Sequence, residues 1–216
     1  MNLSTRKGID DLFKEYPAHH YKKGQVLILP GESTDYAYYL VQGRMKVYDI
    51  SYKGDEITLD IFKEPALFPL SLILNQSATR YIYEADTDME LRRAPALVVL
   101  NFLATHADMT LDLLSHLYDG VDDIVDRMVY LVAGSAKKRI MHELIAMCHR
   151  LGEMRLGGGY SLDMTERELG AKVGLSRETV SREMRGLKQK GLLEIKHKRI
   201  IVRNINQLKA YEQTHH

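Results

Sequence analysis

The sequence has very little cysteine, and this shortage excludes several classes of protein. Cys148 is the single cysteine among 216 residues, so no internal disulfide can form. One cysteine also cannot by itself supply the thiolates of an iron–sulfur cluster or of a four-ligand zinc site. We therefore expect Cys148 to be an inert thiol on a helix.

Long apolar runs are missing as well. No run approaches the length that spans a bilayer, and the opening residues MNLSTRKGIDDLFKEY place no apolar segment behind their basic residues. We expect a cytoplasmic protein without a membrane partner. Because 45% of the residues are hydrophobic and 27% are charged, the chain can form one or two domains with a core.

Histidine is absent from the segment between Tyr21 and Met89. A hydrolase or metal enzyme built on strands of this segment would need histidines and carboxylates clustered on neighbouring strands, so we expect neither catalysis nor a bound metal. His142 and His149 lie seven residues apart, with Cys148 nearby. They leave open a haem or metal site, but this spacing is more typical of solvated or capping histidines.

Positive charge is concentrated in one segment, although the chain as a whole is nearly neutral. The segment from Thr165 to Arg203 holds 11 Lys or Arg and 5 Asp or Glu, whereas the net charge of the whole chain is +1. A local basic excess of this kind is typical of a surface that binds nucleic acid.

Short β-type runs alternate with turn signals from about Tyr21 to Met89. The runs are KGQVLILPGES, YAYYLVQGRMKVYDIS and GDEITLDIF, and the residues that punctuate them are Gly24, Pro30-Gly31, Gly43 and Lys53-Gly54. Turns spaced in this way predict an antiparallel β-roll of the double-stranded β-helix type. Together with the helices that follow, the fold class is α+β.

A long helix over about residues 107–133 is predicted after the roll. Its apolar positions are spaced by 3, 4, 3, 4 and 3 residues: Leu114, Leu117, Val121, Ile124, Met128 and Leu131. This heptad spacing favours a seam that pairs with a second helix in a homodimer, and the alternative is a core helix on the roll. We favour the seam, because a second apolar stripe can face the roll: Leu113, Val125, Val129 and Val132.

Gly134 is expected to end this helix in the left-handed conformation, and Ser135 can cap the next one. We therefore divide the chain into a sensor-like domain of residues 1–134 and a C-terminal domain of residues 135–216.

The basic segment predicts two short helices around a tight turn. Thr165 and Glu168 form a capping box, Gly174 ends the first helix, and Ser176 caps the second. This pattern indicates a helix-turn-helix. The sequence GLLEIKHKRIIVRN follows, and its two apolar runs around a Lys-His-Lys turn predict a wing.

The second of these helices carries the candidate base-reading residues. Val180, Met184 and Leu187 form its buried stripe, so four side chains point elsewhere: Arg177, Glu178, Ser181 and Arg182. Arginine can donate two hydrogen bonds to guanine, glutamate can accept one from cytosine N4, and serine can do either. The alternative is a solvated face with an ion pair between Glu178 and Arg182. We favour base reading, with phosphate contacts from Thr179, Arg185, Lys188, Lys196 and Lys198.

The segment LSRETVSREMRGLKQKGLLE resembles the recognition helix of the Crp/Fnr family of bacterial transcription regulators. KGQVLILPGESTDYAYYLVQGRMKVY resembles the cyclic-nucleotide-binding-type β-roll of that family, and the heptad seam resembles its dimerisation helix. The resemblance implies a homodimer that binds an inverted repeat in double-stranded DNA. It also leaves open RNA polymerase as a further partner. It also implies base reading by Arg177, Glu178 and Arg182 in one branch, and by Glu178, Ser181 and Arg182 in another.

The effector site departs from the family pattern. Pro69 and Leu70 stand where cyclic-AMP binders of the family have Gly-Glu, and Arg80-Tyr81 stands where they have Arg-Ser; Ile124 and Val125 replace the residues that contact adenine. Leu70 cannot accept a hydrogen bond from ribose and Pro69 has no backbone donor, so we expect no cyclic AMP. The cysteine cluster of oxygen-sensing members is also missing, which argues against an iron–sulfur cluster.

The effector therefore stays unknown. If the pocket is used, we expect an apolar or aromatic effector among Phe68, Leu70, Arg80, Tyr81 and Tyr83; the alternative is a filled core that leaves the dimer competent without one. One rival function is a cyclic-nucleotide-binding signalling module whose C-terminal domain contacts protein. Another is a regulator that uses an unrecognised nucleotide pocket.

Overall fold

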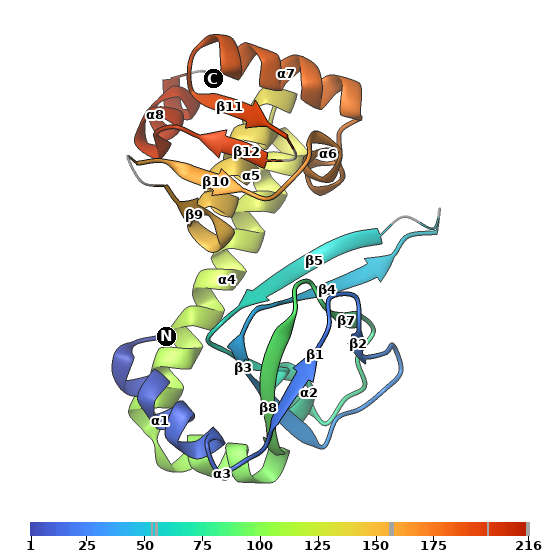
Figure 1. Ribbon diagram of the computed structural model, residues 1–216, viewed down its shortest axis with the longest axis vertical. Coiled ribbons are helices and arrows are strands. Elements are labelled where there is room, and N and C mark those ends of the chain that lie inside the picture. The colour runs from blue at the N-terminus through green and yellow to red at the C-terminus, as the bar shows by residue number, and fades with distance from the viewer. Residues whose placement is uncertain (53, 55, 156–157, 198, 215–216) are drawn as a thin grey trace. The chain divides into compact units, whose positions relative to one another are not determined.

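The computed structural model describes residues 1–52, 54, 56–155, 158–197 and 199–214 of the chain (Figure 1). The chain forms two compact units, Met1–Tyr118 and Asp119–His216. The division falls inside the longest helix, α4 (Ala107–Ala133), rather than at its end near Gly134. Each unit has hydrophobic clusters of its own.

The first unit is an antiparallel β-roll made of two four-stranded sheets, as predicted (Figure 1). The first sheet has the strand order β1-β8-β3-β6: β1 (Ala18–Tyr21), β8 (Met89–Pro95), β3 (Tyr36–Gln42) and β6 (Ala66–Phe68). The second has the order β2-β7-β4-β5: β2 (Val26–Ile28), β7 (Ile82–Ala85), β4 (Arg44–Ile50) and β5 (Glu56–Lys63).

Strand β3 shows why the run AYYL contains no strongly polar residue. Tyr38 and Leu40 belong to the cluster inside the roll, whereas Ala37 and Tyr39 belong to a second cluster on the opposite face. A strand that is buried on both faces needs apolar side chains on both. Three helices contribute to the second cluster: α1 (Leu3–Phe13), α2 (Leu70–Asn75) and α3 (Ala96–Thr105).

Two polar contacts fasten α1 to the roll. The Tyr39 hydroxyl donates to Asp10 Oδ1 at 2.6 Å. Arg92 Nη1 donates to the carbonyl oxygens of Lys14 at 2.9 Å and Tyr16 at 2.8 Å, where the chain leaves α1. The guanidinium thus satisfies carbonyl groups near the C-terminus of the helix, which have no partner within the helix itself.

The second unit begins within α4 and places four further helices around a small antiparallel sheet. The helices are α5 (Ala136–Leu151), α6 (Glu166–Val173), α7 (Arg177–Gln189) and α8 (Ile205–Thr214). The sheet has the order β11-β12-β10-β9: β11 (Leu193–Lys196), β12 (Arg199–Val202), β10 (Tyr160–Leu162) and β9 (Glu153–Met154).

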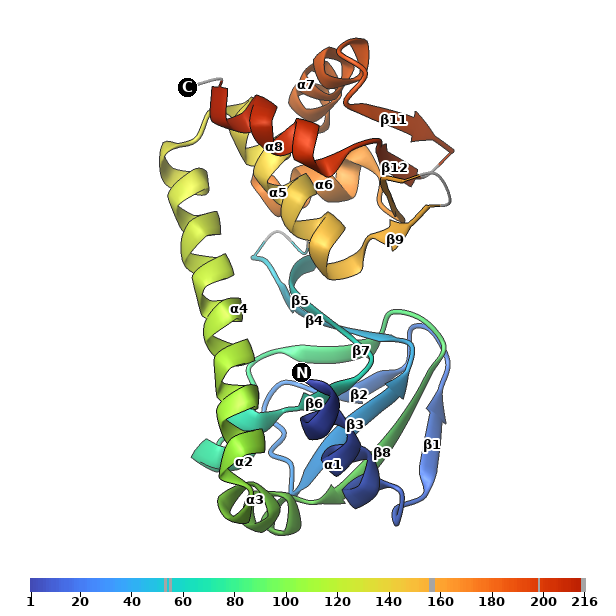
Figure 2. The ribbon, with the colours of Figure 1, turned by 90° about the vertical axis from the view of Figure 1, so that its left-hand side faces the viewer.

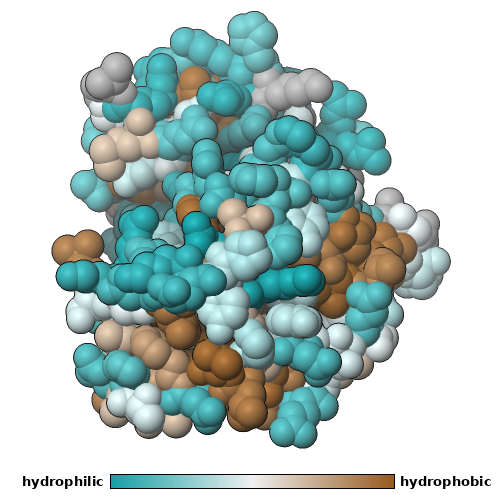
Figure 3. Space-filling model, turned by 60° about the horizontal axis from the view of Figure 1, so that its bottom comes forward, coloured by the Kyte–Doolittle hydropathy of each residue, from teal (hydrophilic) through white to brown (hydrophobic). Residues whose placement is uncertain are grey.

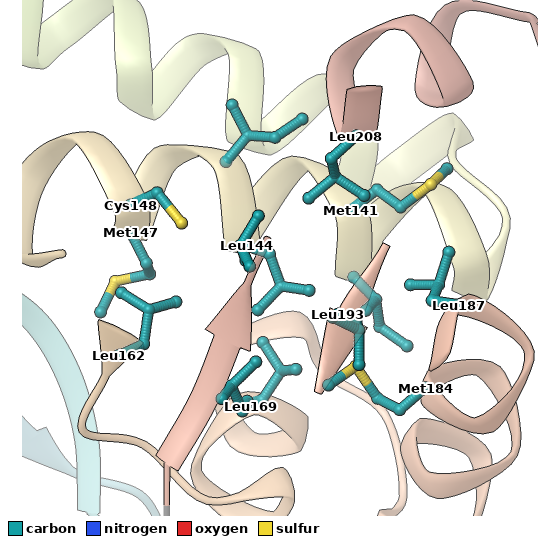
Figure 4. Packing of buried hydrophobic residues seen from close by; sticks show 14 of the residues in the cluster. Met141, Leu144, Met147, Cys148, Leu162, Leu169, Met184, Leu187, Leu193 and Leu208 are labelled. Carbon is teal, nitrogen blue, oxygen red and sulfur yellow. The ribbon is translucent and has the colours of Figure 1, made fainter. Parts of the chain in front are cut away.

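The core of this unit is built mainly from leucine, isoleucine and methionine. Leu144 of α5, Leu169 of α6 and Met184 of α7 are fully buried and point toward one another (Figure 4). Cys148 is buried beside them, and burial raises the pKa of its thiol to about 12. The thiol is therefore protonated and unreactive at neutral pH, as expected.

Helix α4 is one continuous helix (Figure 2). Many of its apolar side chains are exposed. Five of the six seam residues are between 42% and 62% exposed, namely Leu114, Leu117, Val121, Ile124 and Met128, whereas Leu131 is half-buried. The second stripe was expected to face the roll. Leu113 packs on the second cluster, whereas Val125, Val129 and Val132 belong to the other unit and are exposed.

The end of α4 also differs from expectation. Gly134 does not adopt the left-handed conformation. Glycine is needed there for another reason, because a Cβ atom would collide with the carbonyl oxygen of Tyr130. Ser135 caps α5 as predicted, since its side chain accepts a hydrogen bond from the backbone N–H of Lys138.

Apolar patches interrupt a largely hydrophilic surface when the molecule is viewed from the α3 side (Figure 3). Leu97 of α3 and Leu111 of α4 are among the exposed apolar residues. Among the described residues, no single helix is long and apolar enough to cross a membrane; α3 and α4 reach the required length and composition only as a pair bent by 107°.

Candidate nucleic-acid interface

Local hydrogen bonds fix the start of α6 and the turn that follows it. The Thr165 hydroxyl accepts from the Glu168 backbone N–H at 3.3 Å, and the Glu168 carboxylate accepts from the Thr165 N–H at 2.7 Å. This reciprocal pair is the predicted capping box. Gly174 then adopts φ 64°, a conformation that favours glycine, and ends the helix as expected.

The turn leads directly into α7. Ser176 caps this helix by accepting a hydrogen bond from the Thr179 N–H at 3.3 Å. At Gly170 of α6 a Cβ atom would lie 2.8 Å from the carbonyl oxygen of Leu175 and 3.4 Å from Val180. Glycine therefore allows the turn to pass close to α6, so that the two helices pack at a fixed angle.

The buried stripe of α7 sets the direction of its exposed face. Val180, Met184 and Leu187 have no exposed surface, as predicted. The opposite face presents one open hollow, lined by Arg177, Glu178, Ser181, Arg182 and Arg185. The structure therefore brings together all four predicted base-reading residues.

Arg185 is the residue that sequence reasoning placed differently, as a phosphate contact. It lies four residues after Ser181 and three after Arg182, so helical periodicity alone puts it on the same face. Its position in the hollow makes it a further candidate for contact with a base edge.

Two charged side chains of the hollow, Glu178 and Arg182, have identifiable hydrogen-bond partners. The pKa of Glu178 lies below its ordinary value, because its own backbone N–H and the Ser176 hydroxyl favour the ionised carboxylate at the start of α7. Ionised Glu178 can only accept hydrogen bonds. Arg182 contacts Glu183 Oε1 through Nε and Nη2, both at 3.2 Å. Among the described residues, Arg182 thus pairs with Glu183. The ion pair between Arg182 and Glu178, which was the alternative to base reading, does not form there.

Besides Arg185, the described candidate phosphate contacts lie on α7 and β11. Thr179 is half-buried, with its Oγ1 atom 3.2 Å from the Ser176 hydroxyl, and Lys188 is exposed near the end of α7. Lys196 of β11 pairs with Glu194 at 2.9 Å. Lys198 lies outside the described residues.

The wing is a hairpin of β11 and β12, as predicted. Hydrogen bonds from Lys196 and Arg203 lower the pKa of Glu194 to about 2, so this carboxylate stays ionised and offsets part of the wing's positive charge. A second open hollow beside the wing is lined by Asp163, Lys196, His197, Arg199 and Ile201. Arg199 is a wing cation that the sequence reasoning did not single out.

The five candidate effector residues do not form one site. Phe68 is buried inside the roll and stacks with Tyr38 at 5.6 Å and with Tyr83 at 6.3 Å between ring centroids. Leu70 packs on the second cluster instead. Arg80 and Tyr81 are exposed. Aromatic rings therefore occupy the part of the roll in which an effector was considered.

The two histidines that were considered as metal ligands take part in ring contacts. His142 stacks on Tyr130 with centroids 4.0 Å apart, and its Nδ1 atom lies 3.9 Å from Glu212 Oε1. His149 meets Tyr160 edge-on at 6.5 Å. Within the described ranges no group of three or more His, Cys, Asp or Glu side chains is arranged to hold a metal ion.

Comparison with known proteins places this geometry in a family. Residues 18–106 match the cyclic nucleotide-binding domain, and residues 138–211 match the Crp-like helix-turn-helix domain. The global nitrogen regulator of Synechocystis is 26% identical over 190 residues, which cover 85% of this chain and 83% of that protein.

Solved structures share the fold over nearly the whole length. A CRP/FNR-family transcriptional regulator from Thermus thermophilus superposes with a TM-score of 0.71 at 24% identity, covering 91% of this chain and 98% of that one. The c-di-GMP responsive global regulator CLP of Xanthomonas campestris gives a TM-score of 0.73 at 20% identity, with coverage of 91% and 98%. With both domains matched in this order, the chain belongs to the Crp/Fnr family of transcription regulators, which bind DNA through the helix-turn-helix.

Proposed function

We propose that the chain works as a homodimer that reads an inverted repeat in double-stranded DNA through α7 of each protomer. The observation that carries this proposal is the hollow on α7, where Arg177, Glu178, Ser181 and Arg182 converge opposite the buried stripe. With Arg185 this exposed face carries three arginines and one ionised glutamate, and no requirement of the core explains them. Base edges do explain it, because they present donors and acceptors together.

Each side chain has a defined role in this reading. Arg182 and Arg177 donate to guanine O6 and N7, while the Glu178 carboxylate accepts from cytosine N4. Arg182 must leave Glu183 to do so, and its side chain is 71% exposed, so it is free to rotate toward the groove. Ser181 and Arg185 complete the face. Thr179, Lys188, Lys196 and Lys198 hold the phosphates on either side.

Two copies of α7 are needed because one half-site offers few base contacts. The exposed seam of α4 supplies the means of pairing, since its apolar residues recur with the heptad spacing of a two-helix contact. In such a dimer the two recognition helices enter major grooves about 34 Å apart. We propose that the protein acts in the cytoplasm without catalytic activity, and that RNA polymerase is a further partner.

Selection of bound sites from random DNA tests the proposal. Enriched sequences should form an inverted repeat with a G·C pair at the same position of each half-site, its two halves one helical turn apart. Enrichment of single half-sites without symmetry would overturn the dimeric reading, and enrichment of no sequence would overturn base recognition.

Removing one phosphate contact should change the salt dependence of DNA binding rather than its sequence preference. We expect Lys188→Ala to flatten the slope of log affinity against log salt by about one unit, because one fewer counterion is released. The slope is measured by fluorescence anisotropy from low to moderate salt. Lys63→Ala, at the end of β5 in the other unit, removes the same charge and should leave the slope unchanged. An unaltered slope for Lys188→Ala would remove that lysine from the interface.

We also propose that cyclic AMP is not the effector. Support comes from Leu70, which packs on the second cluster, and from Phe68, whose ring stacks with two tyrosines inside the roll. A cyclic phosphate and ribose entering this space would leave polar groups unpaired, at a cost of roughly 1–3 kcal/mol for each. The Xanthomonas regulator of the same fold is described as responsive to c-di-GMP, so other effectors are compatible with this architecture.

Calorimetric titration with cyclic AMP and with cyclic GMP should show no saturable binding at micromolar concentrations, and neither nucleotide should change DNA affinity. A micromolar isotherm that Arg80→Ala abolishes would show that the segment from Pro69 to Tyr81 still binds a cyclic nucleotide, and it would restore the rival nucleotide-binding function.

A further inference from the structure

Helix α4 has a second exposed apolar row that the seam alone does not require. Leu111, Tyr118, Val125 and Val132 follow one another at intervals of seven residues and are between 51% and 85% exposed. When the seam residues Leu114 and Leu117 are assigned to heptad positions a and d, this row falls at position e. A two-helix seam buries a and d, and its e positions usually carry charge.

The other flank of the seam, position g, contains a glycine without a role in its own chain. Gly120 is the middle residue of α4. A Cβ atom built on it would meet nothing within 4 Å, and its φ is not positive. Glycine is among the poorest helix formers. Neither backbone conformation nor packing within the protomer accounts for it.

The described aspartates of α4 lie outside positions e and g. They occupy only positions b and f of the same heptad frame: Asp108, Asp112, Asp119, Asp122 and Asp126. Five like charges at e and g would oppose the approach of an identical helix. Their placement therefore fits a partner with the same acidic sequence, which is a second copy of this chain.

We propose that Gly120 is the point of closest approach between the two α4 helices, and that it receives Val125 of the partner. This inference rests on the proposed dimer. In a parallel pair a g residue meets the e residue five positions later in the other helix, so Gly120 of each protomer faces Val125 of its partner. By two-fold symmetry the contact occurs twice. The missing side chain of Gly120 leaves room for the branched side chain of Val125 and lets the backbones approach.

This contact makes Gly120 and Val125 determinants of which chains can pair. A related regulator with a bulky residue at the g position would exclude Val125 and would form mixed dimers poorly. Fit between a small and a branched residue thus replaces the charge complementarity that e and g positions commonly provide.

The variant Gly120→Ala tests this proposal. A Gly120 that faces water and a Gly120 that receives Val125 predict opposite changes in the dimer dissociation constant. Alanine forms helices better than glycine, so if position 120 faces water, Gly120→Ala should keep or strengthen the dimer. If it receives Val125, the added methyl group should raise the dimer dissociation constant about tenfold or more, and Gly120→Leu should raise it further. Sedimentation equilibrium without DNA measures the constant.

Matched variants separate the outcomes. Gly186→Ala in α7 changes the other mid-helix glycine whose Cβ would meet nothing within 4 Å, and it should leave the dimer constant unchanged. Val125→Ala should recover part of the loss in the Gly120→Ala background, because it makes room across the pair. A dimeric wild type with an equally tight Gly120→Ala dimer would overturn this inference alone. A monomeric wild type would overturn the proposed dimer as well.

Discussion

Ile124→Asp is expected to separate the protomers and to weaken binding to a full operator by about 10²–10⁴-fold, since a protein that grips two linked half-sites gains that much over single binding. Ile124 lies at the centre of the exposed seam and is 60% exposed in one chain. In the dimer it would be buried, and an aspartate there would meet the same aspartate across the two-fold axis. Burial of an unpaired charge costs several kcal/mol, which is more than a helix pair of this length can easily offset.

The measurement has two parts, sedimentation of the protein alone and binding to DNA with one or two half-sites. Ile124→Asp should sediment as a monomer and bind both DNAs with similar, weak affinity. Ser115→Asp adds the same charge at an exposed position outside the seam, and it should remain a dimer with near wild-type affinity. If Ile124→Asp still forms tight dimers, another surface joins the protomers and the heptad pattern was misinterpreted.

Local sequence signals predicted the helix-turn-helix almost completely. The capping box, the left-handed Gly174 and the buried Val180–Met184–Leu187 stripe depend on neighbours within one or two turns, so spacing alone determines them. Once the stripe is buried, the direction of Arg177 and Arg182 follows from helical geometry. The convergence of the reading residues was predictable for this reason, and Arg185 could have been included on the same ground.

Features that depend on distant parts of the chain were predicted less well. An apolar row on a helix can face its own domain or a partner, and the sequence does not distinguish the two; Val125, Val129 and Val132 proved exposed. Pairing between Arg182 and Glu183, rather than Glu178, depends on rotamers that spacing does not specify. For the effector region, alignment placed Arg80 in line with a ligand position, whereas its side chain lies on the surface.

Glu178→Ala should weaken binding to the preferred site by roughly 1–3 kcal/mol, about 5–150-fold, while affinity for random DNA stays equal or rises. The loss of affinity for the preferred site and the equal or higher affinity for random DNA have the same cause, which is removal of the carboxylate. At the preferred site the ionised carboxylate accepts a hydrogen bond from cytosine, whereas on random DNA it only repels phosphates. Arg182→Ala should lose affinity on the preferred site by a similar amount and should gain nothing on random DNA. Competition binding with both DNAs measures each ratio.

The ionisation of Glu178 adds a pH test of the same contact. Its pKa lies below the ordinary value, because the backbone N–H and the Ser176 hydroxyl favour the charged form. A group with a lowered pKa stays ionised as pH falls toward the usual range of a carboxyl group, so discrimination at its base pair should be constant from about pH 7 to pH 5. Glu178→Gln, which keeps the shape and one acceptor oxygen but adds a donor, should relax the preference for cytosine at that position. Equal losses on preferred and random DNA for Glu178→Ala would show that the carboxylate positions the helix and does not read a base.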